Sequence, residues 1–363
     1  MNLKEVVSDG FCLNEIERKI SSFAFISLKT ALKSYFSTYK NSSPFIKTIL
    51  DGDSAVYSKY EKDILYVTDY IEAYAETIIH FQHFFELICK EILRKEHELL
   101  VLNINREHEI LYKLLKNEEV TSSDIEGINT SEFTTTYERL CKLIAAGKLD
   151  SRYQFLAKEE NKNALYKLNH LRNRIWHRGT FVLRYEALDI FIGKYILPII
   201  TEIVSLPEYN GFDRSWKYKR IIHGIDPISE ITNECSKESY NVGKVAFIKE
   251  MGRAAYYNPL QTTFKFFNDE IIKRALSTAN SEVHSNHYSQ GTSIYKCPVC
   301  DVNSLVVYED SEGEMEQDGT YSSYWTYSWY IYCHCCSFKI SHELKNPNEY
   351  GFDLPDYWYF YEH

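Results

Sequence analysis

Two Cys-x-x-Cys pairs near the C-terminal end constrain the fold of this chain more than any other feature of its sequence. The first pair spans residues 297–300 and the second spans residues 333–336. Each pair can form a tight turn that offers two thiolates, and two such turns complete a tetrahedral zinc site with four cysteine ligands. The predicted ligands are Cys297, Cys300, Cys333 and Cys336. His334 or Cys335 could replace one of them.

A site with four cysteine ligands leaves no open coordination position, so the zinc would be structural, and no catalytic metal is expected. The Cys-Pro step of the first pair and the Cys336-Ser337-Phe338 step after the second resemble those of a zinc ribbon. A redox Cys-x-x-Cys pair is the competing interpretation, but the two pairs match each other better than either matches a thioredoxin context. Residues 291–363 are therefore predicted to form a small β zinc-ribbon domain.

The segment between the two pairs is both acidic and aromatic. Its acidic residues predict a loop: Glu309, Asp310, Glu312, Glu314, Glu316 and Asp318. Its aromatic residues predict a strand: Tyr321, Tyr324, Trp325, Tyr327, Trp329, Tyr330 and Tyr332. Exposed rings can stack on bases, but neighbouring carboxylates repel phosphates. A protein-binding or dimerisation surface is therefore favoured over a nucleic-acid platform. The alternative is that the rings only cover a small sheet.

The rest of the chain shows helical periodicity. Apolar residues recur every three or four positions from Glu61 to His97, which predicts one long helix. Four shorter helices are predicted after it, over residues 107–117, 131–146, 162–176 and 185–205.

Proline and small polar residues mark the predicted interruptions. Pro44 is expected to end the amphipathic helical segments of the first 60 residues, and Pro198 is expected to bend or interrupt the helix over 185–205. The best domain boundary is Leu206–Gly211. Residues 275–293 are rich in Ser, Asn and Thr and are interpreted as a linker.

These patterns predict a mainly α protein that ends in a small β domain. Its parts are an N-terminal helical segment (1–60), a helical bundle (61–205), a helical middle region with its linker (206–290) and the zinc ribbon (291–363).

Overall charge limits the classes of function. The chain carries 41 Lys and Arg against 51 Asp and Glu, a formal net charge of −10. This balance argues against a protein that coats nucleic acid nonspecifically, because phosphate binding needs clustered Lys and Arg. One local basic cluster remains, comprising Lys167, His170, Arg172, Arg174, His177, Arg178 and Arg184. No apolar segment is long enough for a bilayer and none resembles a signal core, so a cytoplasmic protein with no membrane contact is expected.

The basic cluster contains the motif Arg172-Asn173-x-x-x-His177 at the end of a predicted helix. Arg can stabilise charge on a phosphate, His exchanges protons near neutral pH, and Asn can orient the imidazole. Asn173 and His177 are four residues apart, so they share a helix face and can hydrogen-bond. The alternative is a solvated helix end, where Arg and His favour the C-terminal dipole.

The motif and its helical context resemble the HEPN superfamily, whose members are small helical bundles and in many cases ribonucleases. Its signature is an Arg, usually followed by Asn or Asp, and then a His after four to six residues, as at Arg172, Asn173 and His177. The superfamily often adds Glu-x-x-x-Lys/Arg on an earlier helix, and Glu86 with Lys90 fits this pattern. The resemblance covers about residues 60–205 and implies a HEPN-like bundle there.

The resemblance also implies a reaction. Two chains would bring their motifs together in a homodimer, and the RNA 2′-hydroxyl would attack the adjacent phosphate. His177 would act as acid or base, Arg172 would stabilise the phosphate, and Asn173 would orient either the histidine or the phosphate. Glu86 and Lys90 would support the site by an ion pair. The residues expected to bind RNA are Lys167, Arg174 and Arg178.

The family context implies a toxin or an abortive-infection effector in defence against phage, controlled by an antitoxin or by a phage-derived trigger. The zinc ribbon would then serve as a sensor or an assembly module. A different class of protein, a non-catalytic scaffold that binds RNA, a nucleotide or a partner protein, is the main alternative. A zinc-ribbon regulator that binds DNA fits poorly with the acidic segment and the negative net charge.

Overall fold

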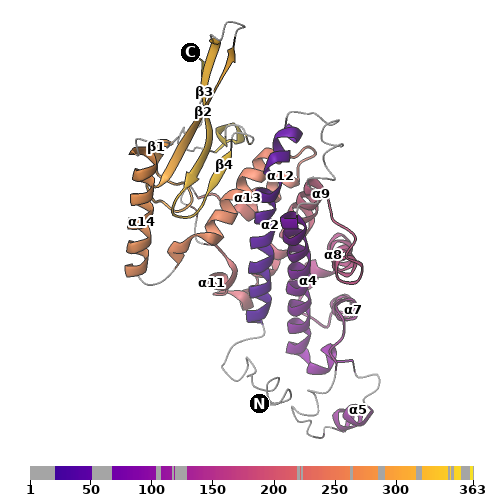
Figure 1. Ribbon diagram of the computed structural model, residues 1–363. Helices are drawn as coiled ribbons and strands as arrows, with labels where there is room; N and C mark the ends of the chain where they lie inside the picture. Colours follow the sequence, from indigo (N-terminus) through magenta and orange to yellow (C-terminus); the bar gives the residue numbers. More distant parts are fainter. Residues whose placement is uncertain are drawn as a thin grey trace, which may run out of the picture. The chain divides into compact units, whose positions relative to one another are not determined.

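A computed structural model describes most of the chain (Figure 1). The described residues are 21–50, 68–103, 108–116, 118, 129–218, 221, 224–261, 265–284, 291–315, 321–341, 344, 347–352 and 360–362. Helices predominate, and a small antiparallel sheet lies near the C-terminal end, as the sequence predicted. Among the described residues, no helix combines the length and the apolar character needed to cross a membrane.

The helices occupy most of the chain up to residue 284. The α-helices are α2 (Ser21–Leu50), α4 (Thr68–Glu96), α5 (His108–Leu115), α7 (Phe133–Ala145), α8 (Glu159–Arg178), α9 (Tyr185–Ile190), α10 (Leu197–Val204), α11 (Asp213–Trp216), α12 (Pro227–Cys235), α13 (Val242–Tyr257) and α14 (Lys265–His284). A π-helical turn, η4 (Phe191–Ile196), joins α9 to α10. The predicted helices over 107–117, 131–146 and 162–176 correspond to α5, α7 and α8, and α4 covers the described part of the helix predicted over 61–97.

One of the two proline predictions needs correction. Helix α2 continues past Pro44 to Leu50, so this proline does not end it. A proline removes one helical hydrogen bond but keeps a helical φ, and Ile46 beyond it is buried. The irregularity expected at Pro198 lies just before it, at η4, and the backbone continues helically from Leu197 into α10. Pro198 has no amide hydrogen to donate to the carbonyl four residues earlier, which lies in η4.

Close packing explains a glycine in η4. A Cβ added to Gly193 would lie 2.5 Å from the Sγ of Cys235 in α12, a separation that real atoms do not reach. Any larger residue at position 193 would push η4 and α12 apart.

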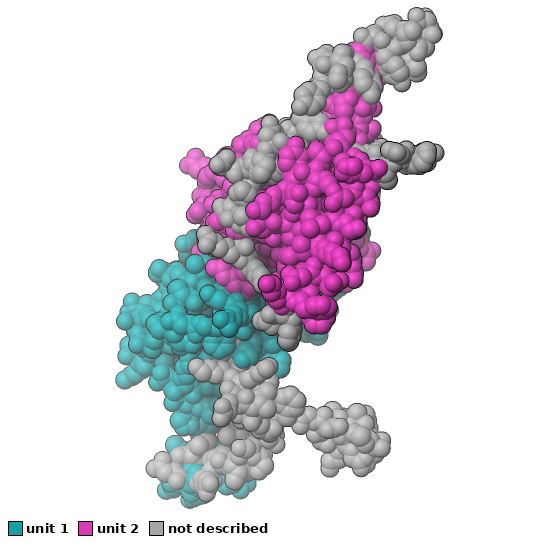
Figure 2. All heavy atoms as spheres, turned by 90° about the vertical axis from the view of Figure 1, so that its left-hand side faces the viewer, with its two compact units in different colours: residues 1–31, 75–181, 199–216 teal, residues 32–74, 182–198, 217–363 magenta. Residues whose placement is uncertain are grey.

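The chain forms two compact units, each assembled from separated stretches (Figure 2). Unit 1 comprises residues 1–31, 75–181 and 199–216, and unit 2 comprises residues 32–74, 182–198 and 217–363. Helices α2, α4 and α10 contribute residues to both units.

The core of unit 1 is aromatic. The ring of Phe25 in α2 lies 4.7 Å from that of Phe212 and 5.4 Å from that of Tyr209, measured between centroids. Phe84 in α4 packs on the same ring at 6.0 Å. These contacts hold the chain that follows α10 against α2 and α4.

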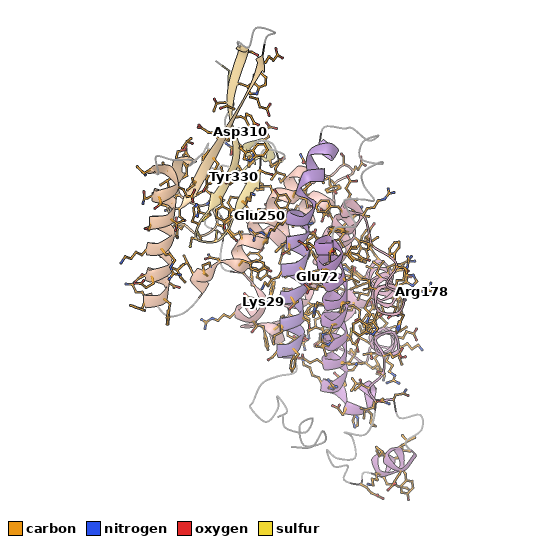
Figure 3. The ribbon with its side chains drawn as sticks, viewed as in Figure 1. Lys29, Glu72, Arg178, Glu250, Asp310 and Tyr330 are labelled. Carbon is orange, nitrogen blue, oxygen red and sulfur yellow. The ribbon has the colours of Figure 1, made fainter. Side chains whose placement is uncertain are left out.

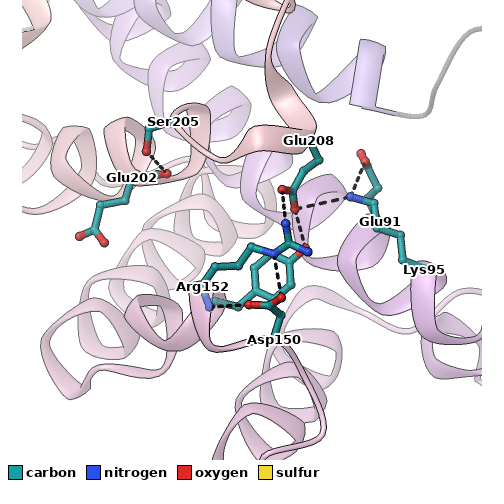
Figure 4. A network of polar contacts seen from close by, with 8 residues as sticks. Glu91, Lys95, Asp150, Arg152, Glu202, Ser205 and Glu208 are labelled. Atoms are coloured by element: carbon teal, nitrogen blue, oxygen red, sulfur yellow. Dashed lines mark hydrogen bonds and ion pairs between the residues drawn. The ribbon is translucent and has the colours of Figure 1, made fainter.

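A polar network at the surface of unit 1 also connects the chain that follows α10 to α4 (Figure 4). The Glu208 carboxylate accepts hydrogen bonds from the Tyr153 hydroxyl at 2.5 Å and from Arg152 at 3.2 Å. Lys95 of α4 lies 3.7 Å from the same carboxylate. Burial acts to raise the pKa of Glu208, but these donors outweigh it, so the pKa is lowered on balance.

Unit 2 contains an antiparallel sheet of five strands. They are β1 (Gly291–Tyr295), β2 (Leu305–Met315), β3 (Tyr321–Cys333), β4 (Lys339–Ser341) and β5 (Phe360–Glu362). The order is β1-β2-β3-β4, and β5 pairs with β3. The aromatic segment therefore forms the predicted strand, β3.

Two predictions in this region were wrong. Glu309, Asp310, Glu312 and Glu314 lie in β2 and not in a loop, because β2 pairs with β3 along its length. Glu316 and Asp318 lie outside the described residues. Part of the predicted linker over 275–293 belongs to α14, which continues to His284. Its small residue Ala279 packs against Val306 and Tyr308 of the sheet, and this contact outweighs the polar composition.

Candidate active site and metal centre

Helix α8 positions the Arg-Asn…His motif on unit 1. Leu165, Leu168 and Leu171 are buried along one side of the helix. Arg172 and Asn173 are half-buried and His177 is exposed. Gly179 ends the helix with a left-handed conformation (φ 61°), and its amide donates to the carbonyls of Arg174 and Ile175. The predicted helix and its predicted end are both confirmed.

Arg172 is half-buried and holds two of its neighbours on the helix. Its Nη1 donates to the Asn173 side-chain oxygen at 3.0 Å. The Trp176 ring centroid lies 5.5 Å from the guanidinium carbon, and Trp176 is 64 % exposed. An arginine side chain already held by an amide and an aromatic ring loses less conformational entropy on binding a phosphate oxygen than an unrestrained arginine does.

Helix α4 carries the predicted Glu86–Lys90 pair. The Lys90 ammonium lies 2.7 Å from the Glu86 carboxylate and also donates to the Thr130 hydroxyl at 3.1 Å. Gln82 donates to the other carboxylate oxygen at 3.1 Å. Burial acts to raise the pKa of Glu86, but the hydrogen bond and charge of Lys90 outweigh it, and the pKa is lowered on balance. The predicted ion pair is present, and Glu86 stays charged.

His83 joins α4 to the motif electrostatically. Burial lowers the pKa of His83, the Glu86 carboxylate acts to raise it, and the charge of Arg172 acts to lower it further. Its Nδ1 is 2.8 Å from the hydroxyl of Ser27 in α2. The charge of Arg172 on α8 and the carboxylate of Glu86 on α4 therefore both act on the His83 imidazole, in opposite directions.

His83 was not among the site residues predicted from the sequence. The available signal was the spacing of three residues between His83 and Glu86, which also places these two on one face.

Of the other two motif residues, Asn173 is half-buried and His177 is exposed. His177 lies in the last turn of α8, and within the part of the chain that the structure describes its ring makes no hydrogen bond. Asn173 is not bonded to it and is held by Arg172 instead. The motif therefore has an exposed imidazole in the last turn of α8, five residues after a half-buried arginine.

The three residues predicted to bind RNA also lie on α8. Lys167 and Arg178 are exposed, and Figure 3 labels Arg178 where its side chain leaves the helix. Arg174 stacks on the ring of Phe181, with its guanidinium carbon 3.5 Å from the ring centroid. Three cations thus accompany Arg172 on one helix, two of them in solvent.

A polar hollow adjoins the Lys90 end of the site. It measures about 520 Å³ and is lined by amides, hydroxyls, one carboxylate and one arginine, contributed by Asn103, Asn129, Thr130, Ser131, Glu132, Thr135 and Arg139. Thr130 is shared with Lys90. Nothing in the sequence indicated this hollow, because its walls come from segments on both sides of residues 104–128.

The four predicted metal ligands of unit 2 converge. The sulfur atoms of Cys297, Cys300, Cys333 and Cys336 all lie within 4.8 Å of one another. The separation between Cys297 and Cys336 and that between Cys300 and Cys333 are both 3.6 Å. Sulfurs bound at about 2.3 Å from a tetrahedral ion lie at about this separation. The cluster could hold a metal ion.

The two Cys-x-x-Cys pairs form turns with the same backbone conformation. Asp301 and Ser337, each directly after the second cysteine of its pair, have φ values of 68° and 61°. In each turn the amide of that residue donates to the carbonyl of the first cysteine. The alternative ligand His334 is instead bonded to the Tyr308 hydroxyl at 3.0 Å, and Cys335 lies outside the group of four.

No family model, curated protein or solved structure matches this chain. The HEPN resemblance therefore depends on the motif residues and their helical context alone. Function has to be argued from the two sites, one built around Arg172 and the other around the four cysteines.

Proposed function

We propose that this protein is a metal-independent endoribonuclease of the HEPN type, with Arg172, Asn173 and His177 as its catalytic residues. The observation that carries the proposal is the arrangement of the motif on α8, where Arg172 is half-buried and hydrogen-bonded to Asn173 at 3.0 Å and His177 is exposed. It places a phosphate-binding cation and an imidazole five residues apart on one helix, and His83 and Glu86 of α4 belong to the same unit.

The proposed reaction is a transesterification. His177 removes the proton of the RNA 2′-hydroxyl, whose oxygen forms a bond to the adjacent phosphorus while the bond to the 5′-oxygen breaks. A second proton donor protonates the leaving 5′-oxygen. Arg172 stabilises the extra negative charge on the phosphate, and Asn173 keeps the guanidinium oriented through their hydrogen bond. The products are a 2′,3′-cyclic phosphate and a 5′-hydroxyl.

We assign the second proton donor to His177 of another copy. A homodimer that brings two α8 ends together would supply two histidines and two arginines to one phosphate. His177 is exposed and makes no hydrogen bond among the described residues, as such a shared role requires. Lys167, Arg174 and Arg178 would bind the flanking phosphates.

The cysteine cluster is proposed to hold a structural zinc ion through Cys297, Cys300, Cys333 and Cys336. Four thiolates match the preference of zinc for sulfur and leave no position for a substrate. A ribonuclease that was always active would damage its own cell, so an effector controlled by an antitoxin or a phage-derived trigger is the proposed context. The zinc-bearing unit is the proposed sensor or assembly module.

Purified protein incubated with total cellular RNA tests the nuclease. The wild type is compared with His177→Ala, and His170→Ala, an exposed histidine on the same helix, is the matched control. Each is assayed with EDTA, and zinc content is measured afterwards because chelation must not strip the cysteine cluster. Cleavage by the wild type and the control, lost in His177→Ala, with cyclic-phosphate ends, supports the proposal.

Equal cleavage by all three proteins would overturn the assignment of His177. Absence of cleavage in all three, in dimeric and folded protein, would favour the non-catalytic scaffold. One observation favours that second candidate: Asn173 is bonded to Arg172 and does not orient His177. Binding of RNA, a nucleotide or a partner protein without chemistry would then be the function to measure.

A further inference from the structure

A second candidate site lies wholly within unit 2. It is a pocket of about 500 Å³ whose walls come from the α2 residues in this unit, from α13, and from strands β3 and β4. Figure 3 labels two lining residues, Glu250 on α13 and Tyr330 on β3. The volume falls within the range of about 300–1,000 Å³ that is typical of sites for small organic ligands.

Basic side chains outnumber acidic ones in the described lining of the pocket, although the whole chain is acidic. Lys40, Arg253 and Lys339 line it, and among the described residues of the lining Glu250 is the only acidic one. That carboxylate is already bound, because Arg253 donates to both of its oxygens at 2.7 Å and the Lys339 amide donates to one at 2.8 Å. The charges of Arg253 and Glu250 cancel, and the two lysines, both exposed, leave the lining positive. A ligand of this pocket should therefore be an anion.

The buried Arg253–Glu250 pair gives the pocket a fixed wall. Arg253 is 8 % exposed and Glu250 is 1 % exposed. Arg253 also donates to the hydroxyl and the carbonyl of Ser337, the residue that follows the metal ligand Cys336. The wall is therefore tied to α13 on one side and to the second cysteine turn on the other.

Aromatic rings form the rest of the lining. Trp329, Tyr330 and Tyr332 contribute from β3. Tyr330 is held firmly, with Tyr308 stacked at 4.4 Å and the Lys339 ammonium 4.8 Å from its centroid. Flat aromatic surface beside lysines suits a ligand that has both a planar ring and a negative charge.

We propose that this pocket binds a nucleotide, with phosphate oxygens on Lys40 and Lys339 and the base against the aromatic residues of β3. Inorganic phosphate alone would satisfy the lysines but would leave the rings and most of the volume unused. A neutral aromatic compound would use the rings but not the charge. The pocket and its ligand are separate from the proposed ribonuclease site, which belongs to unit 1.

Calorimetric titration of the full-length, metal-loaded protein tests this proposal. The probes are AMP, GMP, CMP, UMP and ATP, with inorganic pyrophosphate and adenosine as partial ligands. The variants are Lys40→Ala and Lys339→Ala, because both side chains are exposed. Lys265→Ala, an exposed lysine of unit 2 outside the pocket, is the matched control. Trp329→Leu removes one ring.

At least one nucleotide should bind, and each pocket lysine variant should weaken its binding about tenfold, the effect of one lost charge-assisted contact. Trp329→Leu should weaken the binding of the nucleotide more than the binding of pyrophosphate, and Lys265→Ala should change neither affinity. The proposal is overturned if none of the five nucleotides binds, if the pocket variants bind as the wild type does, or if pyrophosphate binds as tightly as the best nucleotide.

Discussion

The ammonium of Lys249 in α13 lies 2.7 Å from the carboxylate of Asp189 in α9, and both side chains are fully buried. Two tyrosine rings flank the ammonium, Tyr35 at 4.6 Å and Tyr185 at 4.1 Å. Buried pairs of this kind cost desolvation free energy, so each partner depends on the other to remain in the core.

Replacement of one partner should therefore destabilise the protein strongly. Lys249→Met leaves the Asp189 carboxylate buried without its cation, and the free energy of unfolding should fall by about 3–5 kcal/mol. Urea denaturation measures this change. The double variant Lys249→Met with Asp189→Leu should recover most of the loss, and Lys265→Met on the surface should change stability little. A double variant as unstable as the single one would contradict the coupling.

Metal loss should affect unit 2 specifically. Cys336→Ala removes one of four converging sulfurs, so bound metal should fall from one ion per chain to a small fraction of that. The melting temperature should drop by about 10 °C or more, because structural zinc contributes several kcal/mol to folding. Metal analysis and thermal unfolding measure the two effects.

The adjacent Cys335→Ala is the matched control for the metal site. Cys335 is buried and directly precedes Cys336, but it is not one of the four grouped sulfurs. It should retain the metal content of the wild type. Equal metal loss in both variants would mean that the ligand set includes Cys335.

Features set by local sequence were predictable. Gly179 ends α8 because a left-handed residue is needed there, and glycine adopts that conformation without strain. The two cysteine turns are also local, since each is closed by backbone hydrogen bonds within five residues. Their convergence follows from the requirement for four ligands.

Features set by distant contacts were not predictable. His83 meets Ser27 and the charge of Arg172, which come from helices far away in the sequence. The acidic stretch of β2 is a strand because β3 pairs with it, although Glu and Asp disfavour strands. The pocket near Glu250 combines four elements and has no signature in any one of them.

Glu86 should act as a positioning residue for the proposed ribonuclease site. Glu86→Gln removes the charge that holds the Lys90 ammonium and that acts on His83, so cleavage should fall roughly tenfold, about 1.4 kcal/mol in the barrier. Glu91→Gln is a matched control, because Glu91 forms a similar pair with Lys95 on the same helix. It should leave cleavage unchanged.

A purely structural role for Glu86 would leave the pH dependence of cleavage unchanged. The Glu86 charge acts to raise the pKa of His83, so its removal should lower that pKa further. Any part of the pH–rate profile of cleavage that reports the titration of His83 should then shift to lower pH. Glu86→Asp, which keeps the charge, should restore part of the cleavage rate lost in Glu86→Gln. An unshifted profile with a rate loss that follows stability would refute the positioning role.

The free energy of unfolding should decrease as the pH falls below 7, in part because of His83. Burial lowers the pKa of His83 below its ordinary value of 6.5, so the unfolded chain binds the proton more readily than the folded chain. The His83 contribution is therefore present above pH 6.5 and is lost as the pH falls through the range below it. Glu86 and Glu208, whose pKa values are also lowered, lose their contribution only further down, below about 4.5.

Urea midpoints at pH 7.5, 6.5 and 5.5, roughly one unit either side of the ordinary histidine pKa, test this dependence. His83→Gln should flatten the decrease between pH 6.5 and 5.5, and His170→Gln on α8 should leave it unchanged. Part of the slope should remain in His83→Gln, because burial lowers the pKa of His80 and His334 as well. A His83→Gln profile as steep as that of the wild type would show that His83 is not protonated differently in the folded and unfolded states.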